Sequence, residues 1–271
     1  MKVLEIDEIR AVQLELLNHV KNVCEKEGIQ WFLCGGTLLG AVRHKGYIPW
    51  DDDIDIVLPR PDYRRLINAL KTDTGSVYAI LDPYTDKDYH STYVKLIDTR
   101  TKAVYTGSTP FPEKMGVYID IFPFDGVPDE ERERVQYYKE LVRLSNRHGN
   151  SIRQRTLSGW KERLKWMIKL PYIGFCRMVG TEAWKQHLLE AMERYDYQTC
   201  DKIGHLLSIY GLKDVFDKSC FGETVEVEFE GQRYPGPCGC HEYLSALYGD
   251  YMTLPPENKR VSTHDTHYYW R

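Results

Sequence analysis

The chain has 271 residues, enough for one large domain or two small ones. Hydrophobic residues make up 42% of it and the formal net charge is −4, which indicates a soluble globular protein and excludes an overall electrostatic signal for nucleic-acid binding. No apolar run approaches the roughly 20 residues of a membrane-spanning helix. Seven cysteines with no signal peptide before them predict a reduced, cytoplasmic protein.

The first part of the sequence predicts a helix, a strand and a second helix in succession. Apolar residues recur at spacings of three and four over residues 3–27, which predicts an amphipathic helix that ends at Gly28. Residues 29–34 form a short apolar run and predict a strand. A Gly-Gly pair breaks this run, and a second helix is expected over residues 37–44.

The remainder of the chain continues this mixed pattern. Prolines on both sides of Arg60 are expected to end one strand and start a helix. Further expected elements, in chain order, are strands over 77–81, 91–97, 102–106 and 117–122, helices over 128–147 and 181–198, a strand over 223–229 with a hairpin partner at 233–236, and a helix over 241–248. No internal repeat and no linker between independent domains is apparent.

An acidic segment is the strongest candidate for a functional site. Residues 53–56 alternate between acidic and apolar side chains, which is typical of a strand. Asp53 and Asp55 then face one side, in phase with Asp51, while Asp52 is out of phase. Carboxylates on one face repel each other, and a hard divalent cation such as Mg²⁺ relieves the repulsion through oxygen ligands. An edge strand with its acids in water is the alternative, but the flanking residues are too apolar for it.

A further carboxylate lies inside an apolar strand. Asp120 stands in the middle of residues 117–122, where a lone acid is costly unless it is paired or bound to a metal. We therefore expect Asp120 to be a third metal ligand, with a hydrogen-bonded buried acid as the alternative. A turn at residues 123–126 is expected to end this strand.

Gly35 and Gly36 stand where a strand meets the start of a helix. A helix that begins at Thr37 would present backbone N–H groups to a phosphate, and the missing Cβ atoms would let it approach closely. A Gly-Gly pair alone usually marks a turn, but the acidic strand about 15 residues later favours a phosphate site. Arg43 and Lys95 are further candidates for phosphate contacts, with surface salt bridges as the alternative.

These pieces combine into metal-assisted phosphate chemistry. The glycine turn would hold a phosphate, while Asp53, Asp55 and Asp120 would hold one or two ions that offset the charge developing during an in-line displacement. Asp51 would be an extra ligand or a base for the acceptor hydroxyl group. Positioning and electrostatics do most of the work in phosphoryl transfer.

Four segments of the chain carry further information: Gly35-Gly-Thr-Leu-Leu-Gly40, Ile48-Pro-Trp-Asp-Asp-Asp-Ile-Asp55, Tyr118-Ile-Asp-Ile-Phe-Pro123 and Tyr248-Gly-Asp-Tyr-Met252. With these motifs the chain resembles the LicD family. Matches are spread from about residue 15 to residue 260, and the first two motifs are specific when they occur together. The broader pattern, a Gly-[Gly/Ser] turn followed by Asp-x-Asp, is that of the nucleotidyltransferase fold.

The resemblance implies an α+β fold with a nucleotidyltransferase-like mixed β-sheet flanked by helices. Residues 1–127 are expected to form the core that carries the metal site, and residues 128–200 a mostly helical, basic insert. Residues 201–271 would form a C-terminal β-hairpin and helix region that completes the site. Together, residues 1–271 are expected to make a single LicD-type domain.

The resemblance also implies an activity. Bacterial LicD proteins transfer phosphocholine from CDP-choline to sugar hydroxyls of teichoic acid or lipopolysaccharide precursors, and fukutin-like eukaryotic relatives transfer ribitol phosphate from CDP-ribitol. For this chain it implies an enzyme that uses Mg²⁺ or Mn²⁺ and releases CMP, with Asp53, Asp55 and Asp120 as ligands and Asp51 completing the motif. Transfer from another CDP-alcohol, such as CDP-ribitol or CDP-glycerol, and a nucleotidyltransferase acting on a small hydroxyl compound remain as alternatives.

A basic segment suggests where in the cell the enzyme binds its acceptor. Residues 147–180 contain eight Lys or Arg and a single acid, Glu162, interleaved with aromatic and aliphatic side chains. Such a stretch can lie on an anionic membrane surface. Because the eukaryotic relatives carry an N-terminal anchor and this chain has none, we expect a bacterial cytoplasmic enzyme whose lipid-linked glycan acceptor lies at the inner leaflet. The alternative is an ordinary insert with a solvated basic face.

Other candidate residues are weaker. Aromatic faces hold quaternary ammonium groups well, and core packing is the alternative for each of the candidates Tyr47, Trp50, Tyr243, Tyr248, Tyr251, Tyr268, Tyr269 and Trp270. Cys238, Cys240 and His241 suggest zinc, but their spacing is not that of a standard finger and buried thiols are the default interpretation. His264 is a candidate acid or base in what could be a frayed C-terminal tail.

Overall fold

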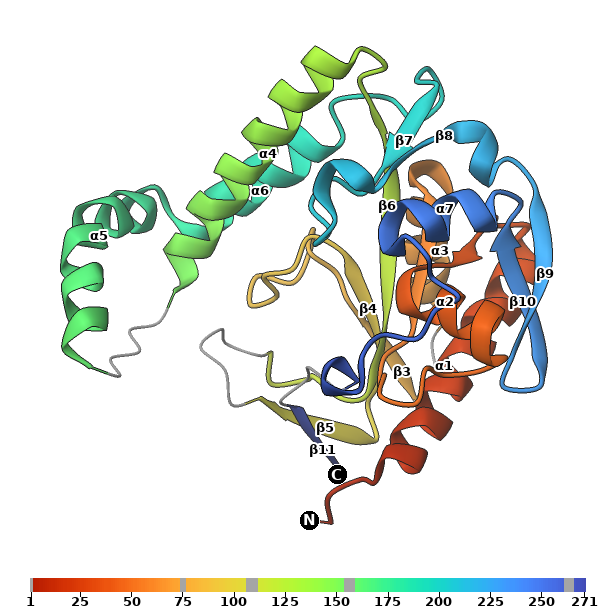
Figure 1. Cartoon of the computed structure of the whole chain (residues 1–271). Helices are drawn as coiled ribbons and strands as arrows, with labels where there is room; N and C mark the ends of the chain where they lie inside the picture. The colour runs from red at the N-terminus through yellow and green to blue at the C-terminus, as the bar shows by residue number, and fades with distance from the viewer. Residues whose placement is uncertain (1, 74–76, 106–111, 154–158, 261–265) are drawn as a thin grey trace.

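The structure, a computed structural model, describes residues 2–73, 77–105, 112–153, 159–260 and 266–271. A mixed β-sheet forms its centre and helices flank it, which confirms the expected α+β class (Figure 1). In the described part of the chain the sheet consists of β1 (Phe32–Leu33), β2 (Asp55–Pro59), β6 (Tyr118–Val127), β4 (Val94–Asp98) and β3 (Tyr78–Leu81) in this order. Strand β7 (Lys202–Gly204) pairs with the far end of β6, and β8 (Val215–Asp217) pairs with β7. Strands β2 and β6 are parallel, and the other neighbouring strands are antiparallel.

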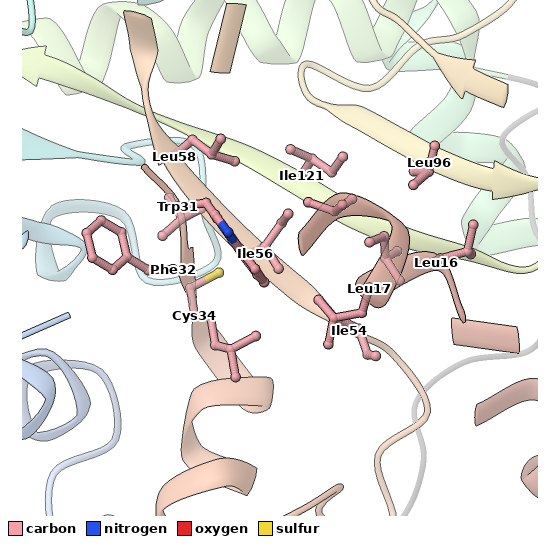
Figure 2. Packing of buried hydrophobic residues seen from close by; sticks show 14 of the residues in the cluster. Leu16, Leu17, Trp31, Phe32, Cys34, Ile54, Ile56, Leu58, Leu96 and Ile121 are labelled. Carbon is pink, nitrogen blue, oxygen red and sulfur yellow. The ribbon is translucent and has the colours of Figure 1, made fainter. Parts of the chain in front are cut away.

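The expected N-terminal helix covers one face of this sheet. Helix α1 (Ile6–Glu27) ends at Gly28, which adopts the left-handed conformation that favours glycine. Helix α1 packs beside α3 (Arg60–Thr72), and both contact the sheet. Leu16 and Leu17 of α1 are fully buried in the same core as the apolar side chains of β2, as Figure 2 shows.

The alternation expected for residues 53–56 is present, although strand β2 itself begins only at Asp55. Ile54 and Ile56 are fully buried in the core, whereas Asp53 and Asp55 are only partly buried. The same period of two continues on β6, where residues on either side of an acid face the core. One face of the β2–β6 pair is therefore apolar and the other carries the acids.

Strand β6 is longer than the sequence predicted, and the turn expected at residues 123–126 is wrong. The strand continues to Val127. The Asp120 amide donates to the Ile54 carbonyl on one side, 2.9 Å, so alternate amides point to that side and the others away from it. The N–H group that Pro123 lacks would point away from β2, beyond the last pairing with β4 and before the first with β7. Pro123 therefore costs the ladder no hydrogen bond.

The middle of the chain is helical, as expected. Helix α4 (Glu131–Ile152) runs five residues beyond its predicted end, because His148 and Ser151 continue its buried face. Helix α6 (Thr181–Met192) stops earlier than predicted, at a turn in which Asp196 accepts hydrogen bonds from the following backbone. Helices α4 and α6 pack together, while α5 (Trp160–Val179) projects away from the sheet in Figure 1.

The C-terminal part returns to the sheet and its helices. The predicted hairpin and helix are confirmed as β9 (Thr224–Phe229), β10 (Gln232–Pro237) and α7 (Cys240–Tyr248). The expectation of a frayed C-terminus is wrong for the last residues, since β11 (Thr266–Trp270) pairs with β5 (Thr101–Tyr105). His264 lies outside the described residues.

Short turns of 3₁₀-helix complete the fold at Gly211–Lys213, Lys218–Phe221 and Glu257–Lys259. Helix α2 (Gly35–His44) follows β1 directly and contacts β2. Within the described ranges, no helix is both long and apolar enough to cross a bilayer.

Candidate active site

A pocket of about 560 Å³ lies against the sheet face that carries the acids. Asp51, Asp53, Asp55 and Asp120 all line it, so the structure brings the four predicted acids together. Asp52, which was expected to be out of phase, does not line this pocket. The spacing of acidic residues in the sequence thus identified which carboxylates share a site.

The parallel pairing of β2 and β6 places two of these acids side by side. Asp55 and Asp120 are direct partners in the register, although 65 residues separate them in the chain. The Asp120 amide donates to the Ile54 carbonyl, and the Cys34 amide donates to the Asp55 carbonyl, 3.1 Å. The backbone around both carboxylates is therefore held by strand pairing on both sides of β2.

Asp55 experiences the crowding of negative charge most strongly. Burial, followed by the charges of Asp53, Asp120 and Asp51, holds its pKa well above the usual range, and Lys95 opposes that shift. Three neighbouring carboxylates thus act on the carboxyl group of Asp55. A site of this kind favours a bound cation, which would remove the cost of ionising Asp55.

The two glycines begin helix α2, two residues earlier than predicted, and their closest neighbours are the acids. A Cβ atom on Gly36 would lie 2.6 Å from Asp51 Oδ2, and one on Gly35 would lie 3.1 Å from Asp55 Oδ2. Gly35 also has φ +53°, in the left-handed region. The absence of side chains therefore lets two carboxylates approach the positive end of the helix dipole.

Thr37 and Lys95 lie behind the acids and do not line the pocket. The Thr37 hydroxyl accepts a hydrogen bond from the Asp55 amide, 2.8 Å, and its side chain is buried. Lys95 is buried too, pairs with the Asp120 carboxylate, and its Nζ lies 3.5 Å from the centre of the Tyr118 ring. Both residues therefore position catalytic candidates, and neither is among the residues that line the pocket.

Arg43 is not brought to the pocket either. It lies near the C-terminal end of α2, about 12 Å along the helix from Gly35. Its Nη1 donates to the Tyr251 carbonyl, 2.7 Å, and its Nε contacts His44. This contact ties α2 to the segment after α7, so the expected phosphate contact is not supported by the position of Arg43.

Helix α1 holds the acidic segment from below, a role that the sequence did not reveal. Arg10 donates to the Asp51 carbonyl, 2.7 Å, and Gln13 donates to the Asp52 carbonyl, 2.8 Å. The Tyr47 hydroxyl in turn donates to Gln13, 3.0 Å. Arg10 and Gln13 lie among the apolar residues of α1 that hydrophobic periodicity assigns to the core. The periodicity therefore did not indicate that they bind the acidic segment.

Aromatic side chains form another part of the pocket wall. Of the predicted candidates, Tyr243 and Tyr248 line it, and the Tyr243 hydroxyl accepts from the Gly35 amide, 3.0 Å. Tyr93 and Tyr210 also line it and were missed. Tyr93 was detectable, because it shares a strand face with Lys95 in the run expected over residues 91–97.

The other aromatic candidates lie outside this wall. Tyr47 packs on Phe229 at 5.0 Å between ring centroids, and Tyr268 packs on Tyr118 at 6.3 Å. The predicted aromatic residues that do not line the pocket are Tyr47, Trp50, Tyr251, Tyr268, Tyr269 and Trp270.

The loop between β7 and β8 adds two titratable residues that the sequence did not indicate. His205 and Asp214 are buried and line the pocket. Burial, with a smaller contribution from Arg60, lowers the pKa of His205 to about 4. Burial raises the pKa of Asp214 to about 7. Asp214 follows a lysine in an irregular segment, so by pattern it looked like a surface turn residue.

The donor set of the pocket fits a hard cation. Asp53, Asp55 and Asp120 offer only oxygen atoms, which Mg²⁺ and Mn²⁺ prefer. Among the described residues no group of three or more His, Cys, Asp or Glu side chains is arranged so that it could hold a metal ion, and Lys95 faces Asp120. Mg²⁺ needs no such cage, because it usually binds through one or two carboxylates together with substrate phosphates and water.

The same geometric result bears on zinc. Cys238 donates to the Ser219 and Cys220 carbonyls, at 3.2 and 3.3 Å, and His241 contacts the Tyr251 hydroxyl, 3.1 Å. All seven cysteines are free thiols. In the part of the chain that the structure describes, these residues therefore form no zinc site.

Comparison with known proteins shows the family to which the chain belongs. Residues 28–160 match the family model described as LicD/FKTN/FKRP, nucleotidyltransferase domain. The chain is also 34% identical, over 97% of its own length and 97% of the relative's, to the lipopolysaccharide cholinephosphotransferase LicD of Haemophilus influenzae. The chain belongs to the LicD family.

A more distant LicD family relative shares part of the chain. The human ribitol 5-phosphate transferase FKRP is 28% identical over 109 residues, which is 40% of this chain and 22% of FKRP. The family model itself covers Gly35, Gly36 and the four acids, but not the loop that carries His205 and Asp214. The wall formed by the C-terminal part therefore lies outside the matched domain.

The raised pKa of Asp214 predicts a pH-dependent gain in stability for Asp214→Asn. The carboxyl group stabilises the folded state while it is protonated, and this contribution is lost as the pH rises from about 4 to about 7. Asparagine stays neutral, so its free energy of unfolding should exceed that of the wild type by on the order of 3 kcal/mol at pH 8. Urea unfolding without ligands at pH 8 and pH 4.5 measures this. An equal difference at both pH values would contradict it.

Proposed function

We propose that this LicD family member transfers phosphocholine from CDP-choline to a sugar hydroxyl group of a lipopolysaccharide or teichoic acid precursor and releases CMP. The observation that carries the proposal is the full-length similarity to the Haemophilus influenzae enzyme, whose name states this head group. The four acids in one pocket, against a helix N-terminus, support phosphate chemistry there.

The reaction needs a base and a source of positive charge from the protein. The acceptor oxygen attacks the phosphorus that carries choline, the bond from that phosphorus to the bridging oxygen breaks, and CMP leaves. The hydroxyl proton passes to a base, for which we propose Asp51, since Gly36 admits its carboxylate and Arg10 holds its backbone. The N-terminus of α2 offers partial positive charge beside the same acids.

We further propose that Asp53, Asp55 and Asp120 hold Mg²⁺ or Mn²⁺. The ion would neutralise the phosphate oxygens and the charge that develops as the bridging bond breaks. The raised pKa of Asp55 supports this role, because a crowded carboxyl group gains most from a cation. Lys95 and Thr37 would keep Asp120 and Asp55 in place when the ligand changes.

Another CDP-alcohol is the second candidate donor. The similarity to FKRP, over 40% of this chain, favours ribitol phosphate as the alternative head group. Incubation of the enzyme with CDP-choline, CDP-ribitol or CDP-glycerol, a glycan acceptor and Mg²⁺ distinguishes the donors by the rate of CMP release. Pyrophosphate release from a nucleoside triphosphate would instead indicate a nucleotidyltransferase.

Replacing a proposed ligand should abolish turnover without unfolding the protein. We expect Asp53→Asn or Asp55→Asn to lower CMP release from CDP-choline by about a hundredfold or more, because charge stabilisation in the transition state is lost. Asp55→Asn should unfold at no lower temperature without metal, since it removes one of the mutually repelling carboxyl groups. The matched control is Asp52→Asn, whose side chain does not line the pocket. Near-normal turnover in either ligand variant would overturn the assignment.

Gly36→Ala tests the placement of Asp51. The added Cβ atom would lie 2.6 Å from Asp51 Oδ2 and push the carboxylate away, so we expect turnover to fall at least about tenfold. Alanine suits a helix, so the melting temperature should not fall. Gly149→Ala in α4 is the matched control, because its Cβ atom meets nothing within 4 Å. Equal turnover in both variants would argue against Asp51.

We propose that α5 contacts the cytoplasmic membrane face, where a lipid-linked acceptor would lie. Its exposed side chains include Met167, Ile168 and Met178, at 65, 73 and 79% exposure, on a helix that projects from the body (Figure 1). Residues 147–180 combine this apolar surface with eight basic residues and a single acid. The charge favours an anionic lipid surface over another protein.

Vesicle flotation tests this contact. The protein should float with vesicles that contain anionic phosphatidylglycerol and much less with neutral phosphatidylcholine. The double variant Ile168→Asp and Met178→Asp should weaken binding at least about tenfold, because the membrane contact loses two apolar side chains that it would bury. Val104→Asp with Val225→Asp, on exposed strand positions, is the control. Unchanged flotation of the α5 variant would exclude this surface.

A further inference from the structure

The C-terminal part of the pocket contains a buried acid that the proposed reaction does not use. The Asp214 side chain is only 5% exposed and lines the pocket together with Tyr210, Tyr243 and Tyr248. Among the residues that the structure describes, no hydrogen-bond donor reaches Asp214 Oδ1. A buried, unpartnered carboxylate oxygen is costly, so its presence in a cavity wall needs a reason.

The backbone fixes this carboxylate in place. The Asp214 amide donates to the Gly211 carbonyl, 3.0 Å, and the Asp214 carbonyl accepts from the His205 amide, 3.1 Å. Gly204 packs so closely on the Asp214 carbonyl that a Cβ atom there would clash. The segment between β7 and β8 is thus a closed loop, and Asp214 is held in it without help from a basic side chain.

The aromatic side chains beside Asp214 indicate which kind of ligand could bind there. The rings of Tyr210 and Tyr248 lie 5.5 Å apart at 77°, so they present faces in different directions. Electron-rich faces and a carboxylate attract a cation. A primary ammonium group would also need several hydrogen-bond acceptors, whereas a quaternary ammonium group has no N–H to satisfy and fits a wall made mostly of rings.

The wall adjoins the acids closely enough for one small head group. The Tyr243 hydroxyl accepts from the Gly35 amide, 3.0 Å, at the start of α2. The buried thiol of Cys34 is affected by both carboxylates, since Asp55 and Asp214 each add to the rise of its pKa after burial. In choline phosphate a two-carbon link joins the phosphate ester oxygen to the nitrogen. The phosphate and the ammonium group therefore match two adjacent parts of one pocket.

We propose that Asp214, with Tyr210, Tyr243 and Tyr248, forms the subsite that holds the quaternary ammonium group of the donor. This inference rests on the proposed function and deepens it, because it names the residues that select choline over a neutral alcohol. Asp214 binds by charge and the tyrosine faces complete the enclosure. The subsite contains none of the proposed metal ligands.

Binding measurements separate this subsite from catalysis. Calorimetry compares phosphocholine with the phosphate ester of 3,3-dimethylbutanol, in which a carbon replaces the charged nitrogen. We expect the wild type to bind phosphocholine at least about tenfold more tightly, and Asp214→Asn to remove most of that preference by weakening phosphocholine alone. Tyr248→Leu should also weaken phosphocholine, while Tyr248→Phe, which keeps the ring face, should retain it. Asp52→Asn is the control and should match the wild type.

Kinetics complete the test. With CDP-choline, Asp214→Asn should raise KM at least about tenfold and change kcat much less, and it should leave the KM for CDP-glycerol unchanged. An equal loss with both donors, or with both phosphate esters, would show a structural role and overturn the subsite. If the wild type prefers phosphocholine but turns over no CDP-choline, the proposed function fails and the subsite stands. If CDP-choline is turned over and Asp214→Asn keeps its preference, only the subsite fails.

Discussion

Repulsion among carboxylates is the constraint on which the rest of this structure depends. Four acids line one pocket, and the pKa of Asp55 shows what it costs to keep them together. Strand pairing aligns Asp55 with Asp120. Gly35 and Gly36 let the carboxylates of Asp55 and Asp51 approach the N-terminus of α2. Side chains of α1 hydrogen-bond the backbone carbonyls of the acidic segment. Each contact restrains a group that its neighbours repel, so the scaffold stores the arrangement that a cation and a phosphate would complete.

The acidic core could be predicted because its signals are local. Alternation over residues 53–56 assigned Asp53 and Asp55 to one face, and a lone acid in an apolar strand identified Asp120 as unusual. The roles of Thr37 and Lys95 were less accessible. Their residue types suit a phosphate contact, but only the register of β6 against β2 and β4 shows that they lie behind the acids.

Other features depend on contacts between distant segments, which no periodic pattern records. Strand β6 passes through Pro123 because the pairing changes from β4 to β7 at that point. The last strand, β11, forms because β5 offers a partner some 160 residues earlier. Tyr210 and Asp214 lie in irregular backbone, where residue type alone suggests a solvated turn, and only the closing of the β7–β8 loop turns them toward the pocket.

One half of the pocket lies inside the domain matched by the family model and the other half lies outside it. This division suits a core that is combined with different head-group sites. The acids lie within the matched domain, whose family model also describes FKRP, and in the proposed reaction they act on the phosphate common to all these donors. The wall that bears Asp214 lies outside that domain, and in the proposed subsite it would face the alcohol. Burial raises the pKa of Asp214 to about 7, so ionising this carboxyl group costs stability at neutral pH. In the proposed subsite, a bound cationic head group would offset that cost.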